Sequence, residues 1–211
     1  MFCYQCQEAA QNVGCTVKGV CGKTPEVAGL QDLLVYQLKG LSVLTKALRT
    51  QGVEVSYANR FIVDGLFMTI TNANFDYERF VSTVRKGFDL REKLEARLAQ
   101  LNVALPQSNT DILTWTAATA EEMEAKAAEV SVLATENEDV RSLRELVIYG
   151  LKGMAAYCEH AFNLNFEDAG VYAFMQDALV ATTDDSLNAE QLTALVLETG
   201  KYGVQVMALL D

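Results

Sequence analysis

The chain is constrained most by apolar residues that recur at helical spacing along almost its whole length. After Thr24 and Pro25, a hydroxyl N-cap and a proline typical of the first helical position, leucines return every three or four residues up to Leu48. Alternation with period two, the pattern of a half-buried strand, persists nowhere in the sequence. We therefore predict an all-α fold. The predicted helices run from Pro25 to a stop near Gly52 and over about 59–71, 76–101, 119–133, 138–163, 167–182 and 188–210, with a loop at 104–118.

The sequence also repeats itself. LQDLLVYQLKG (30–40) aligns without gaps on LRELVIYGLKG (143–153) at an offset of 113, and TNANFDYERF (71–80) aligns on TDDSLNAEQL (183–192) at an offset of 112. Two matches at nearly one offset indicate an internal duplication. In both copies the long leading helix carries a glycine, Gly40 or Gly153, where we expect another backbone to approach closely. We predict a segment 1–24, two related three-helix bundles at 25–103 and 138–211, and a linker 104–137 with a short helix.

Polar side chains mark two further helix starts. Asn74 precedes the third predicted helix and can cap it by accepting a hydrogen bond from a free backbone N–H group. Thr119 and Glu122 have the spacing of a capping box, which opens the short helix of the linker. Acidic pairs such as Asp184 and Asp185 also stand near helix starts, where the helix dipole explains them without a catalytic role.

Cysteines are concentrated in the segment 1–24. Four of the five follow the spacing C-x2-C-x8-C-x5-C, as Cys3, Cys6, Cys15 and Cys21. Thiolates ligate iron–sulfur clusters, glycines can leave amide N–H groups free to donate to sulfur, and apolar neighbours can exclude water. The segment therefore favours an iron–sulfur cluster. The glycines are Gly14, Gly19 and Gly22, and the apolar neighbours are Phe2, Tyr4, Val13, Val17 and Val20.

Other readings of the cysteines remain open at this point. A structural zinc site also uses four cysteines, but it usually groups them as two short knuckles, whereas five residues separate Cys15 from Cys21. Zinc would make the chain a helical interaction or dimerisation module rather than an electron-transfer domain. Disulfides or free thiols are a further alternative, and a reducing compartment disfavours the disulfides.

Charge and hydropathy exclude some classes of partner. The sequence has 17 basic and 28 acidic residues, a formal net charge of −11. Such a surface repels phosphate backbones and anionic lipids, so we expect neither nucleic acid nor a membrane as partner. No apolar run has transmembrane length, and no basic-then-apolar leader precedes Cys3. We therefore expect a cytoplasmic location, where thiols stay reduced.

Several long stretches carry a resemblance to a known family: MFCYQCQE, GCTVKGVCGKTPE, LQDLL, TITNANFD, LATENEDVRSLRELVIYGLKG and the final VMALLD. They resemble the N-terminal domain of the hybrid cluster protein (prismane) family, the hydroxylamine reductases, and the likeness covers the whole chain. It implies two three-helix bundles and a cubane cluster ligated by Cys3, Cys6, Cys15 and Cys21. The short middle spacing looks like the [4Fe-4S] class, because members with a wider spacing carry [2Fe-2S].

The same resemblance implies a longer protein. Family members continue into two further α/β domains that hold a hybrid iron–sulfur–oxygen cluster and reduce hydroxylamine to ammonia or nitric oxide to nitrous oxide. This sequence does not include those domains. The expected partners are the catalytic domains and a redox donor protein, and a homodimer with a second copy is left open.

Outside the segment 1–24 the sequence holds one cysteine, Cys158, and one histidine, His160. Residues two apart on a helix point in different directions, and the repeat aligns Cys158 with Thr45, which is not an iron–sulfur ligand. We expect Cys158 to be a buried small side chain and His160 to be structural. Without ligands for a second cluster, the chain by itself is expected to be inactive toward hydroxylamine.

Overall fold

The structure is a computed structural model that describes residues 1–6, 10–107 and 111–210. Every regular element in that part of the chain is a helix, which confirms the all-α prediction. The α-helices are α1 (Pro25–Arg49), α2 (Ser56–Met68), α3 (Tyr77–Gln100), α4 (Ala120–Glu129), α5 (Glu138–Asn163), α6 (Ala169–Ala181) and α7 (Ala189–Ala208), and three short 3-10 turns are η1 (Ala10–Asn12), η2 (Asp111–Leu113) and η3 (Val132–Ala134).

Two of the predicted helix starts are confirmed and one is wrong. The Thr24 side chain accepts a hydrogen bond from the N–H of Val27, and Thr119 and Glu122 form the predicted capping box. The third helix is capped by Asp76 instead of Asn74. The Asn74 side chain accepts from the N–H of Asp76 at 2.9 Å, so it shapes the turn before the cap.

The helix bounds repeat at the offsets seen in the sequence. α2 and α6 have 13 residues each, and both their first and last residues are 113 positions apart. The N-caps correspond as well, Thr24 of α1 to Asn137 of α5 and Asp76 of α3 to Asn188 of α7. The duplication therefore extends from residue pattern to helix length and capping.

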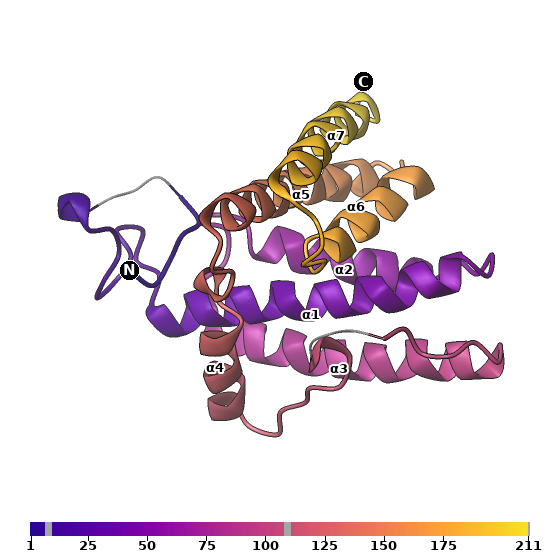
Figure 1. The fold of residues 1–211 in the computed structure, drawn as a ribbon, viewed down its shortest axis with the longest axis horizontal. Helices are drawn as coiled ribbons and strands as arrows, with labels where there is room; N and C mark the ends of the chain where they lie inside the picture. Colours follow the sequence, from indigo (N-terminus) through magenta and orange to yellow (C-terminus); the bar gives the residue numbers. More distant parts are fainter. Residues whose placement is uncertain (7–9, 108–110, 211) are drawn as a thin grey trace.

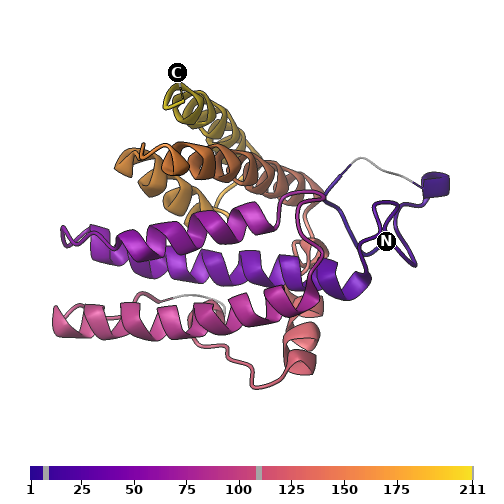
Figure 2. The ribbon, with the colours of Figure 1, turned by 180° about the vertical axis from the view of Figure 1, so that it is seen from behind.

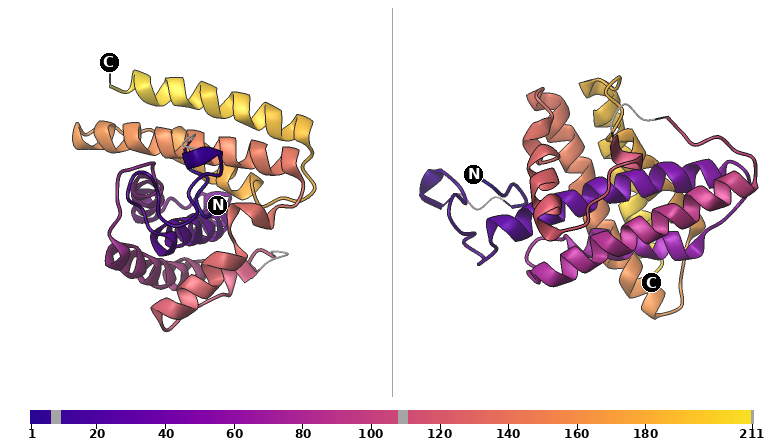
Figure 3. Two further views of the ribbon diagram at one scale, coloured as in Figure 1. Left: turned by 90° about the vertical axis from the view of Figure 1, so that its left-hand side faces the viewer. Right: turned by 90° about the horizontal axis from the view of Figure 1, so that it is seen from below.

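Helix α1 lies at the centre of the molecule. It contacts α2, α3, α4 and α6, while α5 contacts α7 and α2. Figures 1 and 2 show α1 between α3 on one side and α5 and α6 on the other. Figure 3 shows α5 and α7 running across the direction of α1. Buried side chains from both copies form one continuous hydrophobic cluster, so the division into bundles at 25–103 and 138–211 stays a prediction.

The linker departs from prediction in two places. The short helix α4 ends at Glu129 rather than near Leu133, because Ser131 adopts an extended backbone before the separate turn η3. The stretch predicted as loop contains η2, and Trp115 beyond it packs edge-on against Phe88 of α3 at 5.2 Å between ring centroids. The linker therefore packs onto α1 and α3.

The two repeat-related glycines differ in their surroundings. A Cβ atom at Gly40 would lie 2.6 Å from the carbonyl oxygen of Ile112 in η2, so the predicted close backbone approach is confirmed there. A Cβ atom at Gly153 would meet nothing within 4 Å, so the same prediction is wrong for the second copy. The linker supplies, through η2, the backbone that crowds Gly40.

This contrast predicts opposite effects of one substitution. Gly40→Ala should lower the free energy of unfolding by about 2 kcal/mol or more, because η2 must move away from α1. Gly153→Ala should raise it by ~0.5–1 kcal/mol, since alanine favours a helix interior and finds open space. Urea unfolding of the two variants and the parent chain measures both. Equal effects of the two substitutions would contradict the packing described for η2.

Candidate metal centre

The predicted cluster ligands lie at one end of the molecule. The cysteine segment, residues 1–24, has no α-helix in its described part and projects beyond the N-terminal end of α1 (Figure 1). All five cysteines are free thiols. Of the four in the segment, Cys15 is buried, Cys3 is half-buried, and Cys6 and Cys21 are exposed.

The structure brings two of these four cysteines together. The N–H of Phe2 donates to the carbonyl oxygen of Cys15 at 3.0 Å, which joins the two arms of the segment. Burial raises the pKa of the Cys3 thiol, and Cys15 is close enough to add to that rise. Among residues 1–6, 10–107 and 111–210, no group of three or more His, Cys, Asp and Glu side chains could hold a metal ion.

Two details of the predicted surroundings are wrong. Gly14 and Gly22 do adopt positive φ angles of 72° and 96°, but the N–H groups of Gly19 and Gly22 donate to backbone carbonyls within the turn before α1. The valines of the segment do not wrap its interior: Val13, Val17 and Val20 are exposed by 59%, 83% and 60%. The cysteine segment therefore has an apolar outer surface.

The donor set of the segment fits an iron–sulfur cluster. Four free thiols stand on irregular backbone, and soft thiolate donors are the ligands that such clusters take in proteins. Irregular backbone can adjust around a group more readily than a helix whose side chains are already packed. The assignment of Cys3, Cys6, Cys15 and Cys21 as ligands stays a prediction.

A polar network ties the cysteine segment to the helices. The Lys23 ammonium donates to the side-chain oxygens of Gln5 at 3.0 Å and Gln31 at 2.7 Å. Gln31 in turn donates to the carbonyl oxygen of Asn74 at 3.0 Å, and Thr71 donates to the carbonyl oxygen of Gln5 at 2.9 Å. Both ends of the segment are thus fixed to α1 and to the α2–α3 connection. Sequence reasoning missed this network, because a lysine and two glutamines carry no motif.

A cavity of about 430 Å³ lies beside this network, between α1 and α5. Tyr4 and Gln5 of the cysteine segment contribute to its wall. Every lining residue of α1 corresponds in the repeat to a lining residue of α5, a signal already present in the alignment of 30–40 with 143–153. The corresponding pairs are Asp32 and Glu145, Val35 and Ile148, Tyr36 and Tyr149, and Lys39 and Lys152.

The charged pairs of this cavity perturb one another. Burial raises the pKa of Asp32 to about 6, although Lys152 acts in the opposite direction. Burial lowers the pKa of Lys152 to about 8, opposed by Asp32 and Glu145. The pKa of Lys39 is also lowered by burial, and Glu145 opposes that shift. Each carboxylate thus interacts with the lysine of the other repeat copy.

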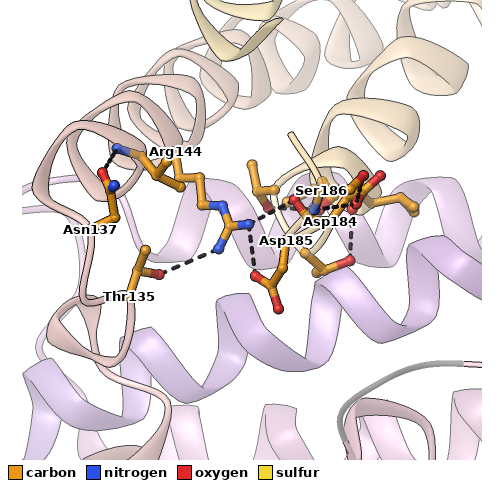
Figure 4. Close-up of polar contacts among 11 residues, drawn as sticks. Thr135, Asn137, Arg144, Asp184, Asp185 and Ser186 are labelled. Atoms are coloured by element: carbon orange, nitrogen blue, oxygen red, sulfur yellow. Dashed lines mark hydrogen bonds and ion pairs between the residues drawn. The ribbon is translucent and has the colours of Figure 1, made fainter. Parts of the chain in front are cut away.

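Arg144 also lines the cavity. Its guanidinium donates to the carbonyl oxygen of Asp184 at 2.8 Å and to the carboxylate of Asp185 at 3.0 Å (Figure 4). It also reaches the hydroxyl of Thr135 at 3.5 Å. Arg144 is only 8% exposed, and its contacts join α5 to the α6–α7 connection and to the end of η3. This arginine acts as a structural clamp.

The raised pKa of Asp32 predicts a pH-dependent cost. Above about pH 6 the Asp32 carboxylate is ionised in both the folded and the unfolded chain, and folding carries the full free-energy cost of burying the charge. Below about pH 4 the carboxyl group is protonated in both states, so this cost vanishes. Asp32→Asn should therefore raise the free energy of unfolding by about 2 kcal/mol near pH 8 and by much less near pH 4. Urea unfolding at the two pH values measures this.

The exposed Asp89 on α3 provides the matched control for that experiment. Asp89→Asn should change the free energy of unfolding by less than ~0.5 kcal/mol at either pH, because water solvates its carboxylate in both states. An equal gain from Asp32→Asn at both pH values would show that ionisation of Asp32 is not the cause.

Cys158 is buried, as predicted. Cys158 is 3% exposed in α5, and its Sγ atom lies 3.9 Å from the sulfur of Met175. Burial raises the pKa of this thiol to about 12. His160 is exposed in the last turn of the same helix.

Comparison with known proteins decides the family. The Prismane/CO dehydrogenase family matches residues 1–211, the whole chain. The chain belongs to this family. It is 65% identical over 211 residues to a hydroxylamine reductase of Parabacteroides distasonis and 61% identical to one of Desulfitobacterium hafniense. A hydroxylamine reductase of Thermoanaerobacter pseudethanolicus is 51% identical over the same length.

These relatives are longer proteins. Each alignment covers 100% of this chain but only 38% of the relative, so the chain corresponds to the N-terminal part of such prismane-family proteins. In the part of the chain that the structure describes, no helix is long and apolar enough to cross a membrane.

Proposed function

We propose that this chain is the electron-relay part of a hydroxylamine reductase. Cys3, Cys6, Cys15 and Cys21 would bind a [4Fe-4S] cluster, which accepts and releases single electrons when bound. The observation that carries the proposal is four free thiols gathered in one irregular segment at the end of a helical scaffold. The family and its relatives named hydroxylamine reductase supply the reaction class.

The chain's own residues would hold and shield the centre. The hydrogen bond from Phe2 to Cys15 fixes the two arms, and the Lys23 network anchors both ends of the segment to the helices. Val13, Val17 and Val20 are exposed on the segment, where the catalytic part of a full-length protein would pack and exclude water. We propose a cytoplasmic protein whose remaining domains take electrons from this segment and reduce hydroxylamine or nitric oxide.

Electron transfer is testable with the chain itself. After anaerobic loading with ferrous iron and sulfide, the visible absorption should fall on addition of dithionite and return on addition of ferricyanide. Repeated cycling without loss supports an electron relay. A colourless protein that binds zinc instead would identify the alternative, a helical interaction module with a structural metal, and would refute the proposal.

The loaded chain should not reduce hydroxylamine by itself. Apart from the four proposed ligands, the sequence contains one further cysteine, the buried Cys158, and one histidine, the exposed His160. These two side chains are too few to ligate a second mixed-ligand cluster. Ammonia formation from hydroxylamine with a reduced viologen measures this. Turnover clearly above that of a Cys15→Ser variant treated in the same way would contradict the prediction and place catalysis within this chain.

A further inference from the structure

Lys23 is a buried cation whose direct partners are neutral. Its side chain is 2% exposed, and its ammonium contacts the amide oxygens of Gln5 and Gln31 and faces the ring of Phe75 at 5.8 Å. None of these groups carries a negative charge. A buried charge is costly unless an opposite charge compensates it, because the protein interior solvates ions poorly.

The surrounding protein does not provide a direct counter-ion. No described carboxylate lies within ion-pair distance of the Lys23 ammonium. Asp32 is within electrostatic range, but it interacts more strongly with Lys152. The side chains around Lys23 thus leave its positive charge without direct neutralisation, and an anion bound nearby would compensate it.

The cysteines stand near Lys23 in the sequence, and one of them, Cys3, is within its electrostatic range. Lys23 follows Cys21 by two residues, and its partner Gln5 stands between Cys3 and Cys6. We propose that Lys23 is a fixed counter-charge for an anionic four-thiolate cluster and sets its reduction potential.

This inference rests on the proposed cluster and adds a role for a residue that does not ligate it. Each electron added to the cluster makes it one unit more negative, and a nearby buried positive charge stabilises that reduced form. Net charge and hydrogen bonding around a cluster are known determinants of its potential. Lys23 should therefore favour the reduced cluster, and hydrogen bonds to Gln5 and Gln31 keep its ammonium in place.

The test is an anaerobic potentiometric titration of the loaded chain, with dithionite as reductant and visible absorption as readout. Lys23→Gln removes the charge and should shift the reduction equilibrium toward the oxidised form by at least about tenfold, which lowers the potential by ~59 mV for one electron. Lys23→Arg keeps the charge and should stay within about threefold of the parent.

Lys18 provides the matched control. It lies in the same segment but is exposed, so Lys18→Gln makes the same change in net charge where water and salt screen it. Its potential should stay within about threefold of the parent as well. Iron content per chain and far-ultraviolet circular dichroism, measured on every variant, separate a change of potential from a loss of cluster or fold.

Each outcome decides the proposal. A Lys23→Gln protein that loads fully and keeps the parent potential overturns it, and so does a shift of equal size in Lys18→Gln. If Lys23→Gln fails to load while Lys23→Arg loads, the charge is required and the proposal is supported. If both fail while the parent loads, Lys23 acts only through packing and the proposal is wrong. If the parent chain itself takes up no cluster, the proposed function fails first.

Discussion

Replacement of Cys3, Cys6, Cys15 or Cys21 by serine should abolish or strongly weaken the visible absorption of the loaded chain. A hard alcohol oxygen replaces a soft thiolate in each variant, and iron–sulfur clusters depend on thiolate ligation. The loss of absorption should be nearly complete for Cys15→Ser, because Cys15 is buried and its backbone is held by the hydrogen bond from the N–H of Phe2. Absorption spectra and iron content per chain, measured after identical anaerobic loading, check the result.

Cys158→Ser is the matched control for these four variants. Its thiol is buried in α5 against Met175, away from the cysteine segment, so the cluster should load normally. The free energy of unfolding should fall by ~1–2 kcal/mol, because a hydroxyl takes the place of a buried thiol. Loss of the visible absorption in Cys158→Ser, or its retention in all four other variants, would overturn the ligand assignment.

Removal of the metal should loosen the cysteine segment and leave the helical scaffold intact. The helices have their own caps and one continuous apolar core, whereas residues 10–21 form no α-helix. Helical circular dichroism should therefore change little on chelation under reducing conditions. Limited trypsin digestion, followed by mass spectrometry, should show a much faster first cut in the segment than in the loaded chain.

The structure sharpens where that cut falls. From sequence, Lys18 and Lys23 are equally plausible sites, but Lys23 is 2% exposed and bonded to Gln5 and Gln31, while Lys18 is exposed. The first cleavage should follow Lys18. A metal-free chain that instead melts in one step on chelation would show that the cluster, not the helical core, stabilises the fold.

Local signals explain why the helices were predictable. The Thr24 cap, the Thr119–Glu122 capping box and the leucines of α1 each act within a few residues of the chain, and the structure contains all of them. The prediction placed the end of α4 too late. The apolar pattern of the sequence continues past Glu129, but the backbone at Ser131 is extended and no longer helical.

Tertiary contacts explain what sequence reasoning missed. Gly40 and Gly153 occupy one repeat position, yet only Gly40 meets Ile112, and this depends on how the linker folds back. Lys23 is a residue type that usually lies on the surface, and only the structure places it between two glutamines. The exposure of the valines in the cysteine segment likewise depends on contacts that no short pattern encodes.

The central claim, an iron–sulfur centre in the cysteine segment, is tested most directly by metal and acid-labile sulfide analysis of the anaerobically purified chain, combined with electron paramagnetic resonance after dithionite reduction. A [4Fe-4S] centre should give a brown protein with about four iron and about four sulfide per chain and a paramagnetic signal on reduction. A colourless protein with about one zinc per chain and no sulfide would contradict it.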